Sequence, residues 1–455
     1  MQNADLLEFF DAVEELSYSK VERIVPDDYL SDKTPGLEGR SFGLIIPQTP
    51  ETVGQVIRLA NLHGVPLVVR GAGTGKSGGA VPLDGDVVLS LELLNRIHEV
   101  DVANCMVSVE SGVILSDLKR SVAEAGLWYP PDPASETTCS IGGNVAVNAG
   151  GPSCLKYGVT GDYVVGLKGF FPTGESFSLG GKLRKNVAGF DLIKLLVGSE
   201  GVLGVITEIT LRLVSPSSAS QDVLYMADTM DEAMTIVQSV CTRYQPVLAE
   251  YWTKECVDSV FNCKGKNVSI PQTPVYVVFR FEGDHHNAVL DQINRLVSTE
   301  GVVDKWKTDL DWDVLWDCRK NISPALTELG GMKRSEDVTV PPASIGEMML
   351  FLGCLNDQSP LKIIGYGHLG DGNIHVNVLK MDLPDSEWES VSMDVMSQVV
   401  NEAIRLGGTI TGEHGVGVSK KRFMSTQFDE KTLGLMRAIK HAFDPNRILG
   451  RGKIL

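Results

Sequence analysis

Two histidines stand on either side of an Asp-Gly pair in the C-terminal half of the chain. We expect His368 and His375 on two strands joined by a two-residue turn at Asp371-Gly372, because this dipeptide favours tight hairpins. In that register the histidines lie directly opposite each other, and directly opposite residues share one face of a hairpin. Asn377 follows two residues later and therefore faces the same side. Two imidazoles so placed could hold one metal ion between them.

A carboxylate to complete such a site is offered by Glu413, which precedes His414 in a segment flanked by glycines. Glycines favour a loop here, and from a loop two adjacent side chains can reach one pocket. Two imidazoles and one carboxylate suit zinc, iron or manganese. An isolated histidine is more often a core or surface residue, a role that we assign to His63, His98, His285 and His286. That role is less suited to His368, His375 and His414, because each lies in a glycine-rich polar segment.

A glycine-rich loop at residues 71–79 follows an apolar strand at residues 65–70 and predicts a nucleotide cofactor. Glycine permits positive φ and close approach of the backbone to a ligand, and successive N–H groups form a concave site for a pyrophosphate. Residues 73–78 match the dinucleotide pattern G-x-G-x-x-G, and residues 75–77 resemble the end of a P-loop. Both motifs require a helix after the glycines. Residues 78–85 contain glycines and a proline and cannot form one, so we reject both motifs.

Two more glycine-rich segments follow, at residues 140–151 and 197–207, and we expect each of them to be a loop. Close packing of backbone against backbone would explain any one of the three segments. A large cofactor threaded between two subdomains explains all of them together, and we prefer that interpretation.

The elements expected around the first loop are short helices and strands. Before the loop we expect an amphipathic helix and a turn at residues 5–24, and a helix at residues 50–63 that begins at a proline. After it we expect strands at residues 87–91 and 106–110, with a helix near residues 115–125.

The character of the sequence changes after residues 214–220, which are rich in serine. Residues 221–360 alternate strands, such as 275–281, with helices at 287–300 and 342–352, which is an α+β pattern around an antiparallel sheet. We therefore expect four parts: an N-terminal helical segment (1–40), a cofactor-binding domain (41–215), a substrate or cap domain (216–425), and a C-terminal helix and tail that return to the cofactor-binding domain (426–455).

Composition narrows the class of protein. The chain has 455 residues, which suggests more than one domain, and its 43% apolar and 22% charged residues are typical of a globular protein. A formal net charge of −17 makes nucleic acid and anionic membrane surfaces poor partners. Eight cysteines without a C-x-x-C pair predict reduced thiols in the cytoplasm and exclude a ferredoxin-type cluster motif. No apolar run is long enough for a transmembrane helix, and the N-terminus lacks a signal-peptide pattern.

The order of four motifs resembles that of FAD-linked oxidases of the vanillyl-alcohol oxidase and p-cresol methylhydroxylase type. The motifs are R-G-A-G-T-G (70–75), P-P-D-P-x-S (130–135), S-I-G-G-N-x-A-x-N-A-G-G (140–151) and G-S-E-G-x-L-G-V-I-T (198–207). The resemblance implies an α+β protein with a two-subdomain FAD-binding domain and an α+β cap domain. It implies non-covalent FAD, because the first loop has no histidine for attachment. The residues expected to contact FAD are Arg70, Gly71, Ala72, Gly73, Thr74, Gly75, Ser77, Gly78, Pro131, Ser140, Gly142, Gly143, Asn144, Asn148, Glu200, Gly201 and Ile206.

The C-terminal segments are similar to those of one branch of these oxidases, the D-lactate and D-2-hydroxyglutarate dehydrogenases and the glycolate oxidase flavoprotein subunit. The matching motifs are G-H-x-G-D-G-N-x-H-x-N (367–377) and G-E-H-G-x-G (412–417). The resemblance implies these roles: a divalent metal on His368, His375 and Glu413, substrate contacts from Arg319, Ser323, Asn377 and His414, and catalysis by Arg319 and His414. Residues 333–335 depart from the basic-aromatic segment of the branch, so the resemblance does not name the residue that reads the far end of the substrate.

These assignments predict FAD-dependent oxidation of glycolate, D-lactate or D-2-hydroxyglutarate to the 2-oxo acid. In this hypothesis Arg319 fixes the substrate carboxylate and the metal lowers the pKa of the 2-hydroxyl group. His414 removes the hydroxyl proton, and the hydride at C2 passes to flavin N5.

Two other functions stay open. A same-fold transferase, alkyl-dihydroxyacetone-phosphate synthase, uses FAD without net oxidation, but it carries histidines where this chain has Gly412-Glu413. A flavoprotein subunit without its own catalysis is the other alternative. No nicotinamide domain or cluster motif is visible, so we expect an electron-transfer flavoprotein, a separate iron–sulfur subunit or a quinone to accept the electrons. We expect a cytoplasmic protein, peripheral to a membrane at most through a partner, and the oligomeric state, including a homodimer, stays open.

Overall fold

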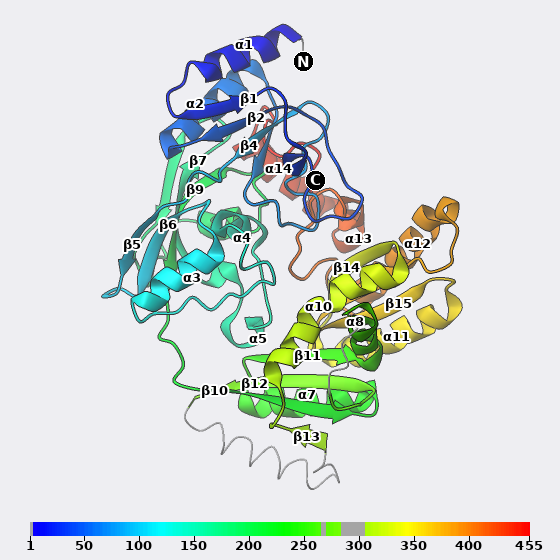
Figure 1. Cartoon of the computed structure of the whole chain (residues 1–455). Coiled ribbons are helices and arrows are strands. Elements are labelled where there is room, and N and C mark those ends of the chain that lie inside the picture. The colour runs from blue at the N-terminus through cyan, green and yellow to red at the C-terminus, as the bar shows by residue number, and fades with distance from the viewer. Residues whose placement is uncertain (1–2, 265–269, 284–304) are drawn as a thin grey trace. The chain divides into compact units, whose positions relative to one another are not determined.

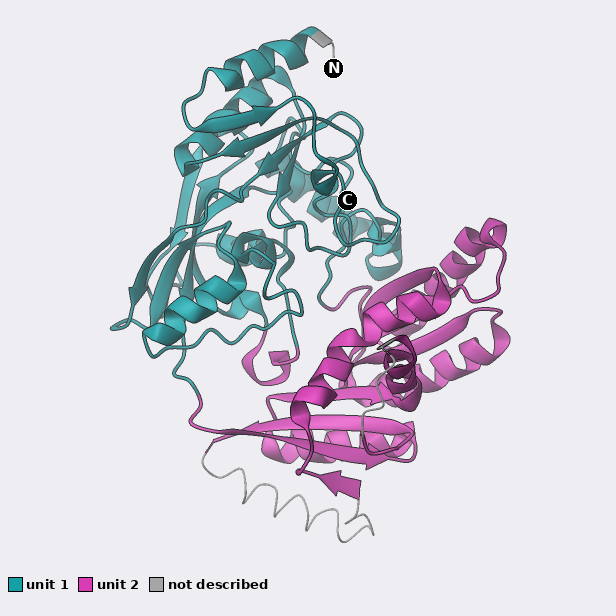
Figure 2. Ribbon diagram, viewed as in Figure 1, with its two compact units in different colours: residues 1–151, 159–216, 413–455 teal, residues 152–158, 217–412 magenta. Residues whose placement is uncertain are grey.

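The computed structural model describes residues 3–264, 270–283 and 305–455. The chain forms two compact units (Figure 2): unit 1 contains residues 1–151, 159–216 and 413–455, and unit 2 contains residues 152–158 and 217–412. The chain re-enters unit 1 at residue 413, earlier than the boundary after residue 425 that we expected. Among the described residues, no helix combines the length and the apolar character needed to cross a membrane.

The first sheet of unit 1 carries the glycine loop at the end of one strand. Its strand order is β1 (Ser19–Glu22), β2 (Ser41–Pro47), β4 (Asp86–Ser90), β3 (Leu67–Arg70), and β4 pairs in parallel with both β2 and β3. Helix α2 (Pro50–His63) connects β2 to β3, as expected, and is capped by Thr49, whose hydroxyl accepts from the Thr52 N–H at 3.3 Å. Helix α1 (Asn3–Glu14) is the helix expected at the start of residues 5–24. The expected turn after it contains β1, because pairing with β2 gives these residues an extended conformation.

The second sheet of unit 1 is antiparallel, with the order β5 (Ile97–Asp101), β6 (Met106–Glu110), β9 (Val205–Arg212), β7 (Val164–Phe170), β8 (Ser176–Gly180). Helices α3 (Leu115–Glu124), α4 (Ile141–Val147) and α6 (Leu192–Leu196) accompany it (Figure 1), with a short 3-10 turn at Thr160–Asp162. Another 3-10 turn, at Asp27–Tyr29, lies between β1 and β2 of the first sheet. The prediction of a glycine loop at residues 140–151 is wrong in part, because α4 occupies most of it. Ser140 caps this helix by accepting from the Gly143 N–H at 3.3 Å.

The C-terminal part of unit 1 contains a 3-10 turn (Lys421–Phe423) and helices α13 (Met424–Gln427) and α14 (Glu430–Phe443). The tail after α14 pairs with β3, since the Leu67 N–H donates to the carbonyl of Ile448 and the Gly450 N–H donates to that of Leu67. The C-terminal tail therefore extends the sheet that carries the glycine loop.

Unit 2 is built on one antiparallel sheet of seven strands. The order is β13 (Trp306–Lys307), β10 (Ser220–Ala227), β12 (Val275–Glu282), β11 (Leu248–Thr253), β15 (Lys362–His368), β16 (Asn373–Leu379), β14 (Lys333–Thr339). The helices are α5 (Cys154–Tyr157), α7 (Met230–Tyr244), α8 (Lys254–Lys264), α10 (Trp312–Gly330), α11 (Ile345–Gln358), which follows a 3-10 turn (Pro342–Ser344), and α12 (Asp385–Arg405). The expected strand at residues 275–281 and helix at residues 342–352 are present. The helix expected at residues 287–300, and His285 and His286, lie outside the described residues.

The two faces of this sheet pack against different helices. Leu248 and Trp252 on β11 belong to a buried cluster with α8 and α10. Tyr251 points to the opposite face, where its hydroxyl lies 3.2 Å from the sulfur of Met349 on α11. Because side chains alternate along a strand, Glu250 must face α10.

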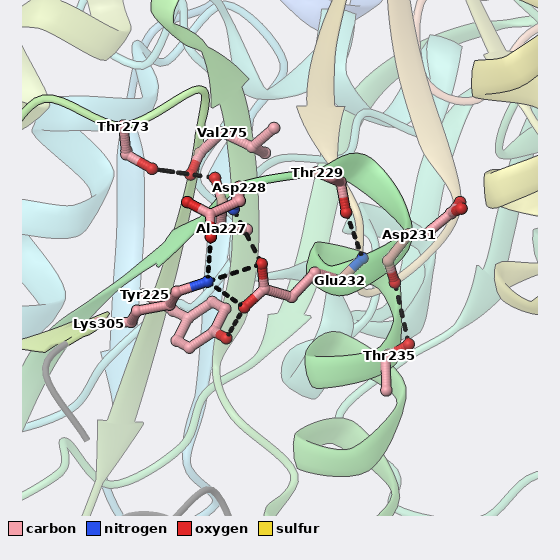
Figure 3. A network of polar contacts seen from close by, with 10 residues as sticks. All are labelled: Tyr225, Ala227, Asp228, Thr229, Asp231, Glu232, Thr235, Thr273, Val275 and Lys305. Carbon is pink, nitrogen blue, oxygen red and sulfur yellow. Dashed lines mark hydrogen bonds and ion pairs between the residues drawn. The ribbon is translucent and has the colours of Figure 1, made fainter. Parts of the chain in front are cut away.

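A polar network joins α7 to the edge of the sheet (Figure 3). Glu232 on α7 contacts the hydroxyl of Tyr225 on β10 and lies 2.7 Å from Nζ of Lys305. The Lys305 amine also lies 2.6 Å from Asp228. Glu232 is therefore a carboxylate that anchors two side chains, at a place separated from β15 by β12 and β11 in the strand order.

Candidate functional site

The hairpin that carries the two histidines forms, but its turn is longer than predicted. Strands β15 and β16 pair His368 with Asn373 and Tyr366 with His375, so residues 369–372 form the loop. A two-residue type I′ turn needs positive φ at both central positions. Gly372 has a φ of 86°, whereas Asp371 does not have a positive φ. The register differs by two residues from the predicted one, and because side chains alternate with a period of two, the histidines still share a face.

His368 lies between an acidic residue and the second histidine. Glu250 on β11 pairs directly with His368, and its carboxylate contacts Nδ1 of the imidazole. Nε2 of His368 lies 3.3 Å from Nε2 of His375. Glu250 is fully buried and His368 is 6% exposed, so this chain of contacts is shielded from solvent.

Arg319 joins the same cluster from α10. Its Nε and Nη2 atoms lie 2.8 Å and 2.7 Å from Oε2 of Glu250, and its guanidinium lies 4.9 Å from the ring centre of Tyr366. Burial alone would raise the pKa of Glu250, but His368 and Arg319 outweigh burial and hold this pKa below its ordinary value. Burial raises the pKa of Tyr366, and the nearby guanidinium limits that rise. Glu250 therefore lies as a carboxylate between two basic groups.

Two more of the expected substrate residues, Asn377 and Ser323, lie on the same unit with partners of their own. Asn377 is 1% exposed, and its side-chain oxygen accepts from the Ser335 hydroxyl at 2.8 Å. The Ser323 hydroxyl lies 2.7 Å from Nζ of Lys333. Lys333 and Ser335, in the segment for which the resemblance names no substrate residue, thus supply neighbours to both groups.

The spacing of the two imidazoles fits a metal ion. Zinc–nitrogen bonds of about 2.0–2.1 Å at a tetrahedral angle place two nitrogen ligands about 3.3–3.4 Å apart. The two Nε2 atoms are separated by 3.3 Å. Unit 2 therefore offers two ligands at a spacing that a tetrahedral divalent ion requires.

The chain leading to Glu413 is fixed next to this pair. Asp337 lies opposite His375 in the pairing of β14 with β16, and its carboxylate accepts from the Gly412 N–H at 3.0 Å and from the Thr411 hydroxyl at 3.1 Å. A side chain at position 412 would collide with Asn373 and Thr339, which explains the glycine. Because consecutive Cα atoms are about 3.8 Å apart, Glu413 begins one residue from this anchored point.

Unit 1 contains a cavity lined by all three glycine-rich segments. Thirteen of the residues expected to contact FAD line it: Gly71, Ala72, Gly73, Thr74, Gly75, Ser77, Ser140, Gly142, Gly143, Asn144, Glu200, Gly201 and Ile206. Glu413 and His414 also line it, together with residues 133–135 of the P-P-D-P-x-S motif. Ser111, which the sequence did not single out, lines it as well.

The polar groups of the cavity fit a phosphate-bearing cofactor. Within the described part of the chain, no N–H of residues 71–79 donates to a backbone carbonyl. The Ser111 hydroxyl and the Asn144 amide nitrogen are buried without a hydrogen-bond partner among the described residues. Buried donors normally have partners, so these groups fit a ligand that supplies acceptors.

Four residues expected to contact FAD do not line the cavity: Arg70, Gly78, Pro131 and Asn148. The Arg70 guanidinium donates to the carbonyl groups of Ser31 and Asp28 at 2.8 Å and 2.5 Å, which ties down the chain before β2. Asn148 ends α4 with a φ of 56° and accepts from the Gly161 N–H at 2.7 Å. Contact with FAD stays a prediction for these four residues, as it does for the thirteen that line the cavity.

Glu200 holds the loop that carries His414. Its carboxylate oxygens accept from the N–H groups of Val416 and Gly417 at 2.7 Å and 2.8 Å. Burial raises the pKa of Glu200, and these two hydrogen bonds oppose the rise. We expected Glu200 to contact FAD; its hydrogen bonds also position the loop at residues 413–417.

Glu250 and Asp337 are not among the site residues predicted from the sequence. For Glu250 a signal existed, because a carboxylate in an otherwise apolar strand is costly to bury unless it is paired. For Asp337 no local signal distinguishes it from Glu336, the acidic residue before it.

Residues 43–180 match the family described as FAD binding domain, and residues 218–454 match that described as FAD linked oxidases, C-terminal domain. The glycolate oxidase subunit GlcD of Bacillus subtilis (strain 168) is 33% identical over 432 residues, which cover 94% of this chain and 91% of the relative. A D-lactate dehydrogenase of Archaeoglobus fulgidus is 34% identical over 446 residues, covering 96% and 98%. A structure of p-cresol methylhydroxylase with substrate bound has a TM-score of 0.80 at 14% identity, covers 100% of this chain and 97% of that chain, and confirms the expected fold.

Proposed function

The chain belongs to the FAD-linked oxidase family, and from this premise we propose that it oxidises a small D-2-hydroxy acid to the 2-oxo acid. It is an FAD-dependent oxidoreductase, as the sequence predicted, and its relatives are named for glycolate and D-lactate. The observation that carries the proposal is the cluster in unit 2, in which one carboxylate joins a histidine pair to a buried arginine.

Arg319 is suited to hold the carboxylate of the substrate. Glu250 occupies the edge of the guanidinium formed by Nε and Nη2. A planar guanidinium has a second edge, Nη1 and Nη2, which can bind another carboxylate through two parallel hydrogen bonds. Ser323 and Asn377 would contact the substrate from α10 and β16.

His414 is the residue that we assign to take the proton of the 2-hydroxyl group. Imidazole suits this role near neutral pH, and His414 lines the cavity assigned to the cofactor. His368, His375 and Glu413 would hold a divalent ion, which supplies Lewis-acid chemistry at the 2-hydroxyl group when bound. FAD, held without a covalent bond, supplies the hydride acceptor at N5 when bound.

The electrons are proposed to leave for an electron-transfer flavoprotein, an iron–sulfur subunit or a quinone. The glycine loop at residues 71–79 is followed by β4 without a helix, so G-x-G-x-x-G does not have the context of a nicotinamide site.

Turnover of a panel of hydroxy acids tests the proposal. We would measure bleaching of dichlorophenolindophenol with glycolate, both lactate enantiomers and both 2-hydroxyglutarate enantiomers. We expect turnover of glycolate or of one D-acid, loss of activity on chelation, and loss in His375→Ala but not in the control His98→Ala. Absence of turnover with every acid would favour a transferase or a non-catalytic flavoprotein subunit, and activity that survives chelation and His375→Ala would remove the metal.

A further inference from the structure

Glu250 lies where a metal ligand and a substrate-binding group meet. One carboxylate oxygen contacts Nδ1 of His368, and the other lies 2.7–2.8 Å from two nitrogens of Arg319. The residue is fully buried in β11 between Leu248 and Trp252, two members of the apolar cluster. A buried carboxylate is expensive to retain, so these contacts need an explanation beyond packing.

The contact with His368 determines where the imidazole carries its proton. An ionised carboxylate only accepts hydrogen bonds, so Nδ1 of His368 must donate to Glu250. In a neutral imidazole the other nitrogen then keeps its lone pair. That nitrogen is Nε2, the atom that lies 3.3 Å from Nε2 of His375. Glu250 therefore selects the tautomer in which His368 can bind a metal ion.

We propose that Glu250 is a positioning residue that fixes the metal-binding tautomer of His368 and, through its second oxygen, the orientation of Arg319. The proposal rests on the proposed function, because it assumes that the histidine pair holds a metal and that Arg319 holds the substrate. A histidine ligand commonly donates its other N–H to a carboxylate, and loss of that partner weakens metal binding about 10–100-fold.

Glu250 acts from outside the metal site. Nδ1 and Nε2 lie on opposite sides of the imidazole ring, so a carboxylate bound to Nδ1 faces away from an ion bound to Nε2. Glu250 also pairs with His368 across β11 and β15, which fixes it on the far side of that ring from His375. Its role is thus distinct from that of Glu413, the expected third ligand.

The first test is Glu250→Gln, with Zn²⁺ binding measured by calorimetry on protein stripped by a chelator. The glutamine amide can donate to Nδ1, which would move the ring proton to Nε2 and block the ligand. We expect Zn²⁺ to bind about 10–100-fold more weakly, and KM for the hydroxy acid to rise because Arg319 loses its charged partner. Glu232→Gln is the matched control, since it removes a carboxylate that also anchors two groups of unit 2 (Figure 3). Wild-type Zn²⁺ affinity in Glu250→Gln would overturn the proposal.

A second measurement needs no folded variant at position 250. In metal-free wild-type protein labelled with ¹⁵N-histidine, we expect His368 to carry its proton on Nδ1, with the signal assigned by its loss in His368→Asn. A proton on Nε2 would overturn the proposal. Neither Zn²⁺ binding nor the tautomer depends on turnover, so a failure of the proposed activity is distinguishable from a failure of this inference.

Discussion

Glu200→Gln tests whether a buried carboxylate positions the loop that carries His414. In the wild-type protein both carboxylate oxygens are occupied, by the N–H groups of Val416 and Gly417. Glutamine keeps one acceptor oxygen, whereas its NH₂ group has no lone pair to offer. One of the two N–H groups therefore loses its acceptor and faces another donor.

The expected loss of stability follows from the one hydrogen bond that glutamine cannot accept. A hydrogen bond to a charged group contributes about 1.5–3 kcal/mol. Part of this loss of stability is offset. Burial raises the pKa of Glu200, which shows that the buried charge costs free energy, and a neutral amide does not carry that cost. We expect the free energy of unfolding to fall by about 1–2 kcal/mol. For a domain of about 150–250 residues, this corresponds to a decrease of about 2–8 °C in Tm. If the whole loss acts on the position of His414, kcat/KM falls about 5–30-fold.

The assay combines thermal unfolding with dye-linked turnover, each normalised to bound FAD. The control is Glu110→Gln, because Glu110 is 3% exposed and one of its oxygens accepts from the Arg96 N–H at 2.8 Å, a contact that glutamine can keep. We expect the control to change turnover little. If Glu200→Gln retains both the Tm and the turnover of the wild-type protein, the loop is held by other contacts and the reasoning is wrong.

Three further predictions concern the base, the cofactor and a buried lysine. His414→Ala should lower turnover about 10²–10⁴-fold while FAD stays bound, and unchanged turnover would mean that another group takes the proton. Acid precipitation should leave FAD in a yellow supernatant, since residues 71–79 contain no histidine; colour in the pellet would show covalent attachment. Burial lowers the pKa of Lys453 to about 8, against 10.5 for an ordinary lysine. Between these pH values the unfolded chain holds more protons than the folded one, so the unfolding free energy should rise with pH by about 3 kcal/mol, and denaturant titrations of Lys453→Met should lack that rise.

The sequence predicted the face of the histidine pair better than its register. The Asp371-Gly372 pair predicts a two-residue turn, yet the loop extends from residue 369 to residue 372. The prediction that the two histidines share a face holds despite this error. Side chains alternate along a strand, so a shift of two residues leaves each of them on its own face. The diagonal arrangement of His368 and His375 still brings their Nε2 atoms to 3.3 Å.

The glycines of residues 140–151 misled the prediction of local structure for a physical reason. Glycine disfavours a helix by about 1 kcal/mol relative to alanine, so two adjacent glycines argue for a loop. In the structure Gly142 lies in the first turn of α4, where a Cβ atom would approach Ser111 to 2.5 Å. Close approach to Ser111, the residue after β6, required the glycine, and the cap at Ser140 allowed the helix to form regardless.

The contacts of Glu250 could not be derived from local patterns, because its partners come from β15 and α10, far away in the sequence. The same register that builds the sheet also assembles these contacts. A slip of one residue between β11 and β15 would place Ala249 or Tyr251 opposite His368 and turn Glu250 toward α11. His368 would then lose its acceptor and Arg319 its charged partner in a single step. The pairing that buries the core of unit 2 thus also holds together the polar cluster to which we assign metal and carboxylate binding, so variants that loosen β11 should impair both together.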